Sequence, residues 1–195
     1  MARVTVFGAG AAGTALAMHL ARAENDTVLW ASDFDARVLP FLDGERKHPN
    51  LPAYLPESLR VMGPQELADA AKGAEVAVMG ANSGGARSLA AIVVDQLEDD
   101  LTVLSLAKGL EPDSRKRMSE VYREVIGHGR VVSMGGPCLA QEVAEELPSA
   151  VVFACGLPEI AEGLRPVFET RAFRVTVTDD VLGLEYCTVL KNVAA

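Results

Sequence analysis

The sequence is short of positive charge, and this shortage excludes a class of partner. It contains 18 Lys and Arg residues against 27 Asp and Glu residues, which gives a formal net charge of −9. A protein that binds nucleic acid needs clustered basic side chains for the phosphates, so no nucleic-acid partner is expected. The phosphates of a small cofactor need only local donors, and an acidic chain can still bind one.

Cysteine is also scarce. Cys138, Cys155 and Cys187 are odd in number and show no C-x-x-C spacing, so they indicate thiols in a reducing compartment rather than a disulfide framework. The histidines that could join them in a metal site are His19, His48 and His128. Their spacing does not match that of zinc ligands, and we expect no metal site.

Long apolar runs are absent as well. No run reaches the roughly 18 residues of a membrane span, and Met1 to Arg3 lead directly into a strand pattern rather than a signal peptide. We find no low-complexity segment, solenoid repeat or obvious linker. The sequence therefore predicts a cytoplasmic protein without an integral membrane segment.

What the chain does contain is an alternation of short β-branched runs and helical stretches over 195 residues, 49% of them hydrophobic. Strands are predicted at 3–7, 27–30, 59–61, 76–79, 101–106, 130–134, 150–154 and 173–177. Helices are predicted at 11–23, 33–42, 64–71, 86–97, 113–126, 141–146, 159–168 and 181–195. The proline-rich stretch 48–56 is predicted to be loop. This order predicts an α/β fold: a doubly wound, Rossmann-type, mostly parallel sheet with flanking helices that ends in the start of a long helix.

A glycine turn, G-A-G-A-A-G at residues 8–13, follows the first strand and opens the first helix. Gly8 permits the tight turn, Gly10 lets the backbone approach a pyrophosphate, and Gly13 lets the helix pack close to the strand. The helix N-terminus supplies free N–H groups and partial positive charge. In this context the motif predicts dinucleotide binding. The alternative is a glycine turn that serves only helix–strand packing.

An acidic residue follows the second strand. Asp33 lies about twenty residues beyond the glycine turn, where a carboxylate would bind ribose hydroxyls and repel the extra phosphate of NADP. It could instead cap a helix that starts at Phe34. Ser32 could contact ribose or phosphate. We expect NAD or NADP as cofactor, with NAD favoured.

Several segments in order resemble one family. They are 8–17 (GAGAAGTALA), 54–56 (YLP), 105–111 (SLAKGLE), 136–144 (GPCLAQEVA), 173–175 (FRV) and 185–193 (EYCTVLKNV). Together they are similar to the N-terminal domain of the soluble bacterial NAD(P)-dependent sn-glycerol-3-phosphate dehydrogenases. The resemblance covers nearly the whole chain. It implies a cofactor domain at 1–180 and, at 181–195, the start of a C-terminal helical substrate domain.

The resemblance implies hydride transfer between NAD(P)H and dihydroxyacetone phosphate, giving sn-glycerol 3-phosphate for glycerophospholipid synthesis. Lys191 matches the catalytic lysine, Lys108 matches a second active-site lysine, and Asn192 neighbours the substrate. The substrate contacts expected are Lys108, Gly136, Cys138 and Lys191. The cofactor contacts expected are Gly8, Ala9, Gly10, Ala11, Ala12, Gly13, Ser32, Asp33 and Lys108. A homodimer is left open as the assembly.

The chain departs from the family pattern at four places near the expected active site. They are Ala12, the loop 80–85, Cys138 and the pair Cys187–Thr188. The residues that hold the substrate phosphate in the family's C-terminal domain are not in this sequence, so we expect the chain alone to be inactive. Two alternatives stay open: a non-catalytic NAD(P)-binding module, and a related 3-hydroxyacid-type dehydrogenase with another substrate.

Overall fold

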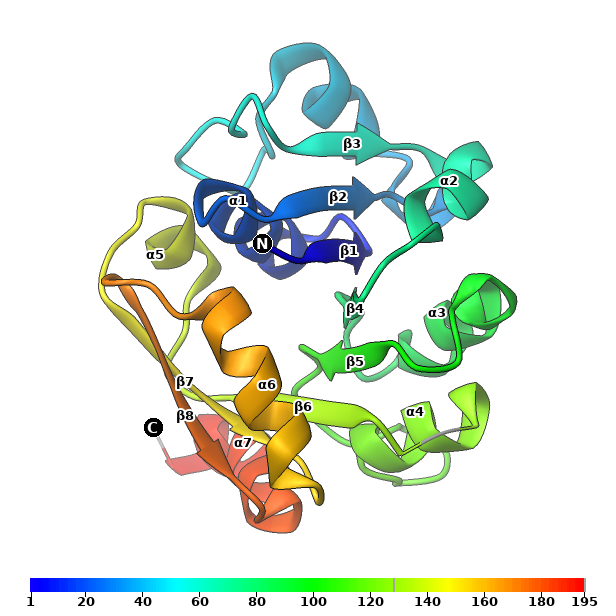
Figure 1. The fold of residues 1–195 in the computed structure, drawn as a ribbon, viewed down its shortest axis with the longest axis vertical. Helices are drawn as coiled ribbons and strands as arrows, with labels where there is room; N and C mark the ends of the chain where they lie inside the picture. The colour runs from blue at the N-terminus through cyan, green and yellow to red at the C-terminus, as the bar shows by residue number, and fades with distance from the viewer. Residues whose placement is uncertain (128, 195) are drawn as a thin grey trace.

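One sheet of eight strands organises the molecule (Figure 1). The computed structural model describes residues 1–127 and 129–194, and the side chains of 191–194 lie outside that description, as does His128. The strand order is β3-β2-β1-β4-β5-β6-β7-β8. The strands are β1 (Arg3–Phe7), β2 (Asp26–Trp30), β3 (Arg60–Met62), β4 (Val76–Met79), β5 (Thr102–Ser105), β6 (Val131–Gly135), β7 (Ser149–Ala154) and β8 (Phe173–Thr178). Among these strands, β6 and β7 pair antiparallel, and the remaining pairs are parallel.

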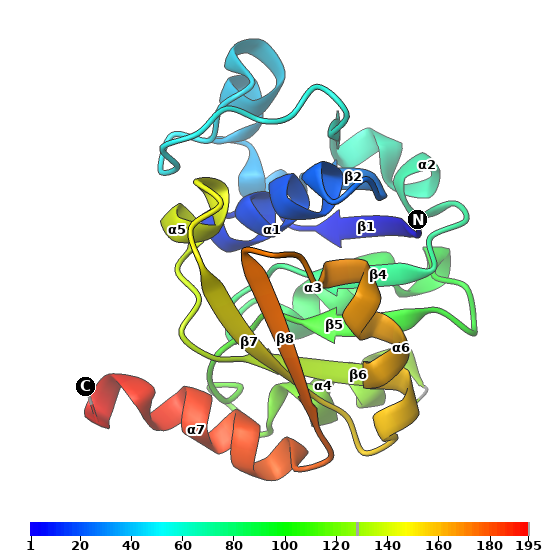
Figure 2. The same ribbon diagram turned by 60° about the vertical axis from the view of Figure 1, so that its left-hand side comes forward.

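Helices cover both faces of the sheet (Figure 2). They are α1 (Ala11–Arg22), α2 (Leu67–Ala71), α3 (Ala86–Val93), α4 (Met118–Ile126), α5 (Ala140–Ala144), α6 (Pro158–Phe168) and α7 (Val181–Ala194). The cluster of buried apolar side chains on one face joins α1, α5 and α6 to the sheet, and the cluster on the other face joins α2, α3 and α4 to it. This arrangement confirms the predicted doubly wound α/β fold.

Alternate residues of each central strand point to opposite clusters. In β1, Val4 and Val6 belong to the α1 side and Phe7 to the α3 side, and all three are fully buried. A parallel strand covered by helices on both faces must be apolar throughout, which is why the sequence shows continuous apolar runs here. Each such side chain contributes about 1.5–3 kcal/mol of burial free energy relative to exposure.

Helix α1 is buried almost all round. Residues 13–21 are all shielded because the sheet covers one side of the helix and α5 and α6 cover others. The imidazole of His19, which sequence analysis gave no role, lies 2.7 Å from the carbonyl oxygen of Phe168 and stacks against Phe173. Burial lowers the pKa of His19. The ring therefore joins α1 to α6 and β8 as a neutral hydrogen-bonding group.

Two predicted helices differ from the structure. The stretch predicted at 33–42 forms only a 3-10 turn, Asp33–Asp35, followed by a π-type turn at Phe41–Glu45. The helix predicted from 113 begins at Met118, because Arg115 has a positive φ of 57° and the carbonyl of Lys116 accepts the N–H of Glu111. Both segments are shaped by bonds of their own loops rather than by helical periodicity.

Helix α7 lies beside β6 and β7 and then extends away from the sheet (Figure 2). Val181 and Glu185 are buried, whereas Leu182, Tyr186 and Leu190 are 55%, 45% and 55% exposed. The long helix predicted at the end of the chain is therefore present, and it leaves apolar side chains in solvent.

Candidate functional site

The carboxyl ends of β1, β2 and β4 meet around one cleft of about 400 Å³. Its lining includes Gly8 and Gly10 from the glycine turn, Ser32 after β2 and Gly80 after β4. The strand order reverses between β1 and β4, and open α/β sheets bind their ligands at such a point, outside the carboxyl ends of the strands. The cleft is therefore the expected place for a dinucleotide in this fold.

The glycines at and beside the turn are glycine for different physical reasons. A Cβ atom at Gly13 would overlap the carbonyl oxygen of Gly8, and one at Gly80 would lie 2.9 Å from the same oxygen. A Cβ atom at Gly10 would meet no protein atom within 4 Å. Packing alone thus explains Gly13 and Gly80, but it leaves Gly10 unexplained. The open space at Gly10 fits a cradle whose backbone must approach a ligand.

The first turn of α1 faces this space with its backbone. Gly10 is the N-cap in an extended conformation, and among the described residues no side chain caps the turn. The first N–H groups of a helix have no acceptor within the helix, and the helix dipole adds partial positive charge there. The turn at Ala11 and Ala12 can therefore bind an anionic group.

A buried histidine braces the glycine turn, and sequence analysis missed it. His48 is 2% exposed and is hydrogen-bonded to the backbone of Ala9, while its Nδ1 accepts the N–H of Asn50 at 3.0 Å. Burial lowers the pKa of His48, which favours the neutral ring. The only signal in the sequence was a histidine in a proline-rich loop. The pairing with Ala9 depends on the fold that brings the loop back over the turn.

The corner beyond β2 differs in detail from the prediction. Ser32, rather than Asp33, is the N-cap, and both its N–H (2.9 Å) and its hydroxyl (2.8 Å) donate to the carboxylate of Asp35. The alternative considered for Asp33, that it caps a helix starting at Phe34, is therefore wrong. Ser32, Phe34 and Asp35 line the cleft, with Phe34 78% exposed, and Asp33 lies exposed on the same turn. Sequence analysis did not single out Phe34 or Asp35.

A second, small cavity brings three predicted site residues together. Lys108, on the loop after β5, lines it with Ala12 of α1 and with Cys138, which follows β6. Its volume is about 40 Å³. Gly136 lies in the same turn as Cys138, whose N–H donates to the Gly136 carbonyl at 3.0 Å. The four residues come from three distant segments, and the sheet places all of them at its carboxyl edge.

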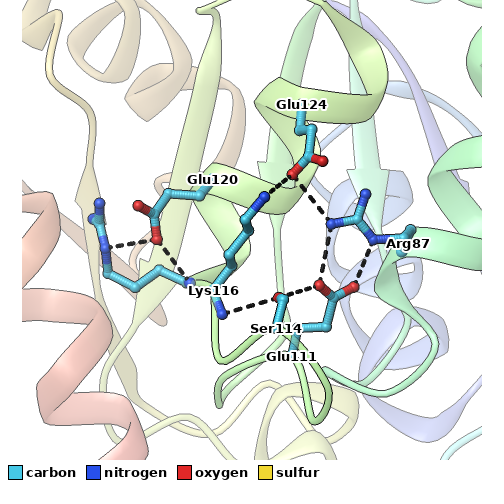
Figure 3. A network of polar contacts seen from close by, with 7 residues as sticks. Arg87, Glu111, Ser114, Lys116, Glu120 and Glu124 are labelled. Carbon is cyan, nitrogen blue, oxygen red and sulfur yellow. Dashed lines mark hydrogen bonds and ion pairs between the residues drawn. The ribbon is translucent and has the colours of Figure 1, made fainter.

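The loop that carries Lys108 is held by a network of charged side chains (Figure 3). The guanidinium of Arg87, on α3, donates to both carboxylate oxygens of Glu111 at 2.7 and 3.1 Å, and the hydroxyl of Ser114 donates to the same carboxylate. Arg87 also pairs with Glu124 of α4 at 3.2 Å, and Lys116 pairs with Glu124 at 2.6 Å. Residues on α3 and α4 thereby fix the loop between β5 and α4.

Residues 115–117 lie inside the range 113–126 that was predicted to be helical, but they precede α4. The segment is a loop end, and the side chain of Arg117 is only 19% exposed. Arg117 pairs with Glu120 and with Glu185, which is 6% exposed on α7. No local pattern in the sequence indicates this contact, because its partners are 68 residues apart.

The remaining predicted residues lie on α7. The helix is described through Ala194, so Lys191 and Asn192 are on its last turns, but their side chains lie outside the described residues. Cys187 is exposed, and the hydroxyl of Thr188 donates to the carbonyl of Glu185 at 2.7 Å. The structure thus places Lys191 on the helix beside β6 without describing its contacts.

Comparison with known proteins decides the family. Residues 3–161 match the family model described as "NAD-dependent glycerol-3-phosphate dehydrogenase N-terminus". The chain belongs to this family. It is 37% identical over 195 residues to the glycerol-3-phosphate dehydrogenase [NAD(P)+] of Streptomyces avermitilis, an alignment that covers 98% of this chain and 57% of that protein. It is 32% identical over 199 residues to the NADP(+)-dependent glycerol-3-phosphate dehydrogenase of Archaeoglobus fulgidus, covering 97% of this chain and 57% of that protein.

A solved glycerol-3-phosphate dehydrogenase has the same fold. The crystal structure of the Coxiella burnetii enzyme superposes with a TM-score of 0.89 at 27% identity, covering 98% of this chain and 58% of that chain. The present chain therefore spans a little over half the length of these relatives. The fold and the family are shared over that part.

In residues 1–127 and 129–194, no helix has both the length and the apolar character needed to cross a membrane. Within the same described ranges, no three His, Cys, Asp or Glu side chains gather closely enough to hold a metal ion.

The Glu111 network generates a pH prediction. The hydrogen bonds from Arg87, and then that from Ser114, lower the pKa of Glu111 to about 2. A carboxyl group whose pKa is lowered on folding stabilises the protein above its unfolded pKa, about 4.3, and loses this effect as the pH falls toward the folded value. Glu111→Gln should therefore lower the urea midpoint at pH 7, and the difference from wild type should shrink between about pH 4.5 and 2.

Urea unfolding from pH 7 down to 2 measures this difference. The control is Glu57→Gln, which changes an exposed glutamate and should shift the midpoint little at any pH. A Glu111→Gln difference that stays constant down to pH 2 would show that the ionised carboxylate is not what stabilises the loop.

Proposed function

We propose that this chain is the cofactor-binding part of an oxidoreductase that interconverts dihydroxyacetone phosphate and sn-glycerol 3-phosphate with NAD(H) or NADP(H). Family membership supports the reaction class. The observation that carries the proposal is the meeting of two features at one edge of the sheet. The open glycine turn lies beside the cavity lined by Lys108 and Cys138, and Ala12 of α1 links the two.

The cleft residues fit a dinucleotide. The open space at Gly10 and the N–H groups of Ala11 and Ala12 suit a pyrophosphate. Ser32 lies where a ribose hydroxyl would bind, and the exposed ring of Phe34 offers a face for the adenine. The bound cofactor supplies or accepts the hydride. The chain's own residues orient it and place its reactive end toward Lys108.

The lysines supply positive charge for the substrate. When a carbonyl is reduced its oxygen becomes an alkoxide, and a nearby ammonium stabilises this charge more strongly in the transition state than in the ground state. We assign this role, and the transfer of the proton, to Lys191. Lys108 and Asn192 position the substrate, and Gly136 and Cys138 form part of its wall.

Residues 181–195 begin a second domain in this proposal. Leu182, Tyr186 and Leu190 follow one another at intervals of four residues, so they share one side of α7. The relatives are longer than this chain. We propose that a C-terminal part like theirs covers this side of α7 and supplies the groups that bind the substrate phosphate. The 195-residue chain alone is then expected to reduce little dihydroxyacetone phosphate.

The departures from the family pattern bear on the choice of substrate. Ala12 and Cys138 both line the small cavity with Lys108, and the loop 80–85 contributes to the cofactor cleft. A changed substrate, as in a related 3-hydroxyacid-type dehydrogenase, would act through these positions. A non-catalytic binding module would keep the cleft and dispense with the lysines.

Gly10 and Gly13 give a matched pair of glycine substitutions. Gly10→Val puts a side chain into the space for the pyrophosphate, so the Kd for NAD(H) should rise at least tenfold, about 1.4 kcal/mol, with little change in Tm. Gly13→Ala forces a Cβ against the carbonyl of Gly8, so stability should fall by about 1–3 kcal/mol. Cofactor titration and thermal unfolding measure the two effects. Equal titrations for wild type and Gly10→Val would contradict the proposed cradle.

The acidic turn after β2 should favour NAD over NADP. Asp33 and Asp35 are negative, and Arg37 is the first basic residue after the strand. Asp33→Ala should narrow the ratio of the NADP to the NAD Kd several-fold, about 1 kcal/mol for one charge at a partly exposed site, with Tm nearly unchanged. Asp35→Ala should lower Tm, because it removes the two bonds from Ser32, worth about 1 kcal/mol as a cap. A ratio that responds to Asp35 and not to Asp33 would move the selective role to Asp35.

Lys191→Ala should have the largest effect on turnover. In the full-length protein, kcat should fall about 100-fold or more, which is the scale of general acid catalysis. The Kd for NAD(H) should stay nearly the same, because the glycine turn is untouched. Lys108→Ala should act more through KM if it mainly positions substrate. A kcat within about threefold of wild type would remove Lys191 from the chemistry.

A further inference from the structure

One buried carboxylate joins α7 to the rest of the molecule. Glu185 is 6% exposed. Its carboxylate accepts the backbone N–H of Ser119 at 2.8 Å, the hydroxyl of Ser119 at 2.8 Å and the hydroxyl of Ser133 at 3.0 Å. Ser119 is in the first turn of α4 and Ser133 is in β6. Three elements that are remote in sequence therefore meet at a single side chain.

An arginine completes the environment of this carboxylate. Nη1 of Arg117 lies 3.2 Å from Glu185, and Nε of the same guanidinium lies 3.2 Å from Glu120. A charge removed from water is costly unless it is paired and hydrogen-bonded, and apolar side chains often stabilise such a position equally well. Stability alone therefore gives little reason for a glutamate here. Four directed bonds instead fix the rotation and register of α7 against α4 and β6.

The distance between α7 and β6 is fixed by contact at Gly135. A Cβ atom at this position would lie 2.6 Å from Cδ1 of Leu184 and 2.9 Å from Cγ2 of Thr188. The helix is thus pressed against the strand at the residue before Gly136, which we assign to the substrate wall. Glu185 lies between Leu184 and Thr188, so the same turn carries both the close contact and the polar anchor.

The partner of Glu185 closes the loop that carries Lys108. Arg117 forms a β-bridge with Leu110, and the N–H of Glu111 donates to the carbonyl of Lys116 at 2.9 Å. Lys108 lies just before this bridge. The network in Figure 3 holds the loop to α3 and α4, and Arg117 extends the connection to α7. The loop and the helix are thereby tied by one ion pair.

We propose that Glu185 is a positioning residue: it holds α7, and with it the proposed catalytic Lys191, in register with the loop of Lys108. Lys191 follows Glu185 by six residues on the same helix, about 9 Å along its axis. Displacement of a catalytic group by about 1 Å can cost 100-fold in rate. This inference rests on the proposed role of Lys191.

Hydrogen exchange on the 195-residue chain tests the mechanical part without any activity. Glu185→Gln keeps the shape of the side chain but removes the charge that pairs with Arg117. Amides of residues 184–190 should exchange about tenfold faster or more in this variant, because α7 opens more easily. The control is Glu120→Gln, which removes the other partner of Arg117 and leaves α7 attached, so its exchange in 184–190 should stay within about twofold of wild type. Unchanged exchange in Glu185→Gln would overturn the proposal.

A double-mutant cycle on the intact protein tests the catalytic part. Glu185→Gln should lower kcat about tenfold or more in the wild-type background. The Kd for NAD(H) should not change, and neither should the fraction of the protein that binds cofactor in a titration. In the Lys191→Ala background the same change should alter kcat by less than about twofold, because the group it positions is gone. A merely structural glutamate would give the same fold-loss in both backgrounds, and that result would overturn the proposal.

The same cycle separates this inference from the proposed function. If Lys191→Ala alone leaves kcat near wild type, the catalytic assignment of Lys191 fails, and the positioning role falls with it. If Lys191→Ala is strongly impaired and Glu185→Gln has equal effects in both backgrounds, the proposed function stands and only the role of Glu185 is refuted.

Discussion

The convergence of three backbone segments at the carboxyl end of β1 is the constraint on which the site depends. The N–H of Gly80 donates to the carbonyl of Phe7 at 2.8 Å, while Gly13 and Gly80 both approach the carbonyl of Gly8 too closely for a Cβ atom. This contact sets α1 directly over the end of β1 and beside the end of β4. The first turn of α1, the space at Gly10 and the cavity at Ala12 all take their places from it.

Charged side chains position the parts of the site that the sheet itself does not reach. Arg87 and Glu111 hold the loop after β5 to α3, and Arg117 and Glu185 hold the end of that loop to α7. Exposed ion pairs contribute little to stability as a rule, but pairs shielded by neighbouring elements fix geometry through directed bonds. The network therefore fixes where the loop of Lys108 and helix α7 lie, in addition to any contribution to stability.

The sequence was sufficient for features that depend on local periodicity and on glycine. Apolar strands, the long helices and the turn at 8–13 each follow from residues close together in the chain. It failed where side chains bond to segments far away or reshape a loop. Asp35 accepts two hydrogen bonds from Ser32, which close a short turn where a helix was predicted at 33–42. The ring of His48 is hydrogen-bonded to the backbone of Ala9, and the guanidinium of Arg117 pairs with Glu185. The partners of His48 and Arg117 have no signature in periodicity, because only the folded chain brings them together, whereas Ser32 and Asp35 are near neighbours that form a local capping box.

We propose that a dinucleotide binds along the cleft from Ser32 across Gly10 toward Lys108. The most direct measurement is a crystal structure of the 195-residue chain soaked with NADH. The expected result places the pyrophosphate within hydrogen-bond distance, about 2.7–3.2 Å, of the backbone N–H groups at the start of α1, with the nicotinamide toward Lys108 and Cys138. A cofactor bound elsewhere on the protein, with the space at Gly10 empty, would contradict the account.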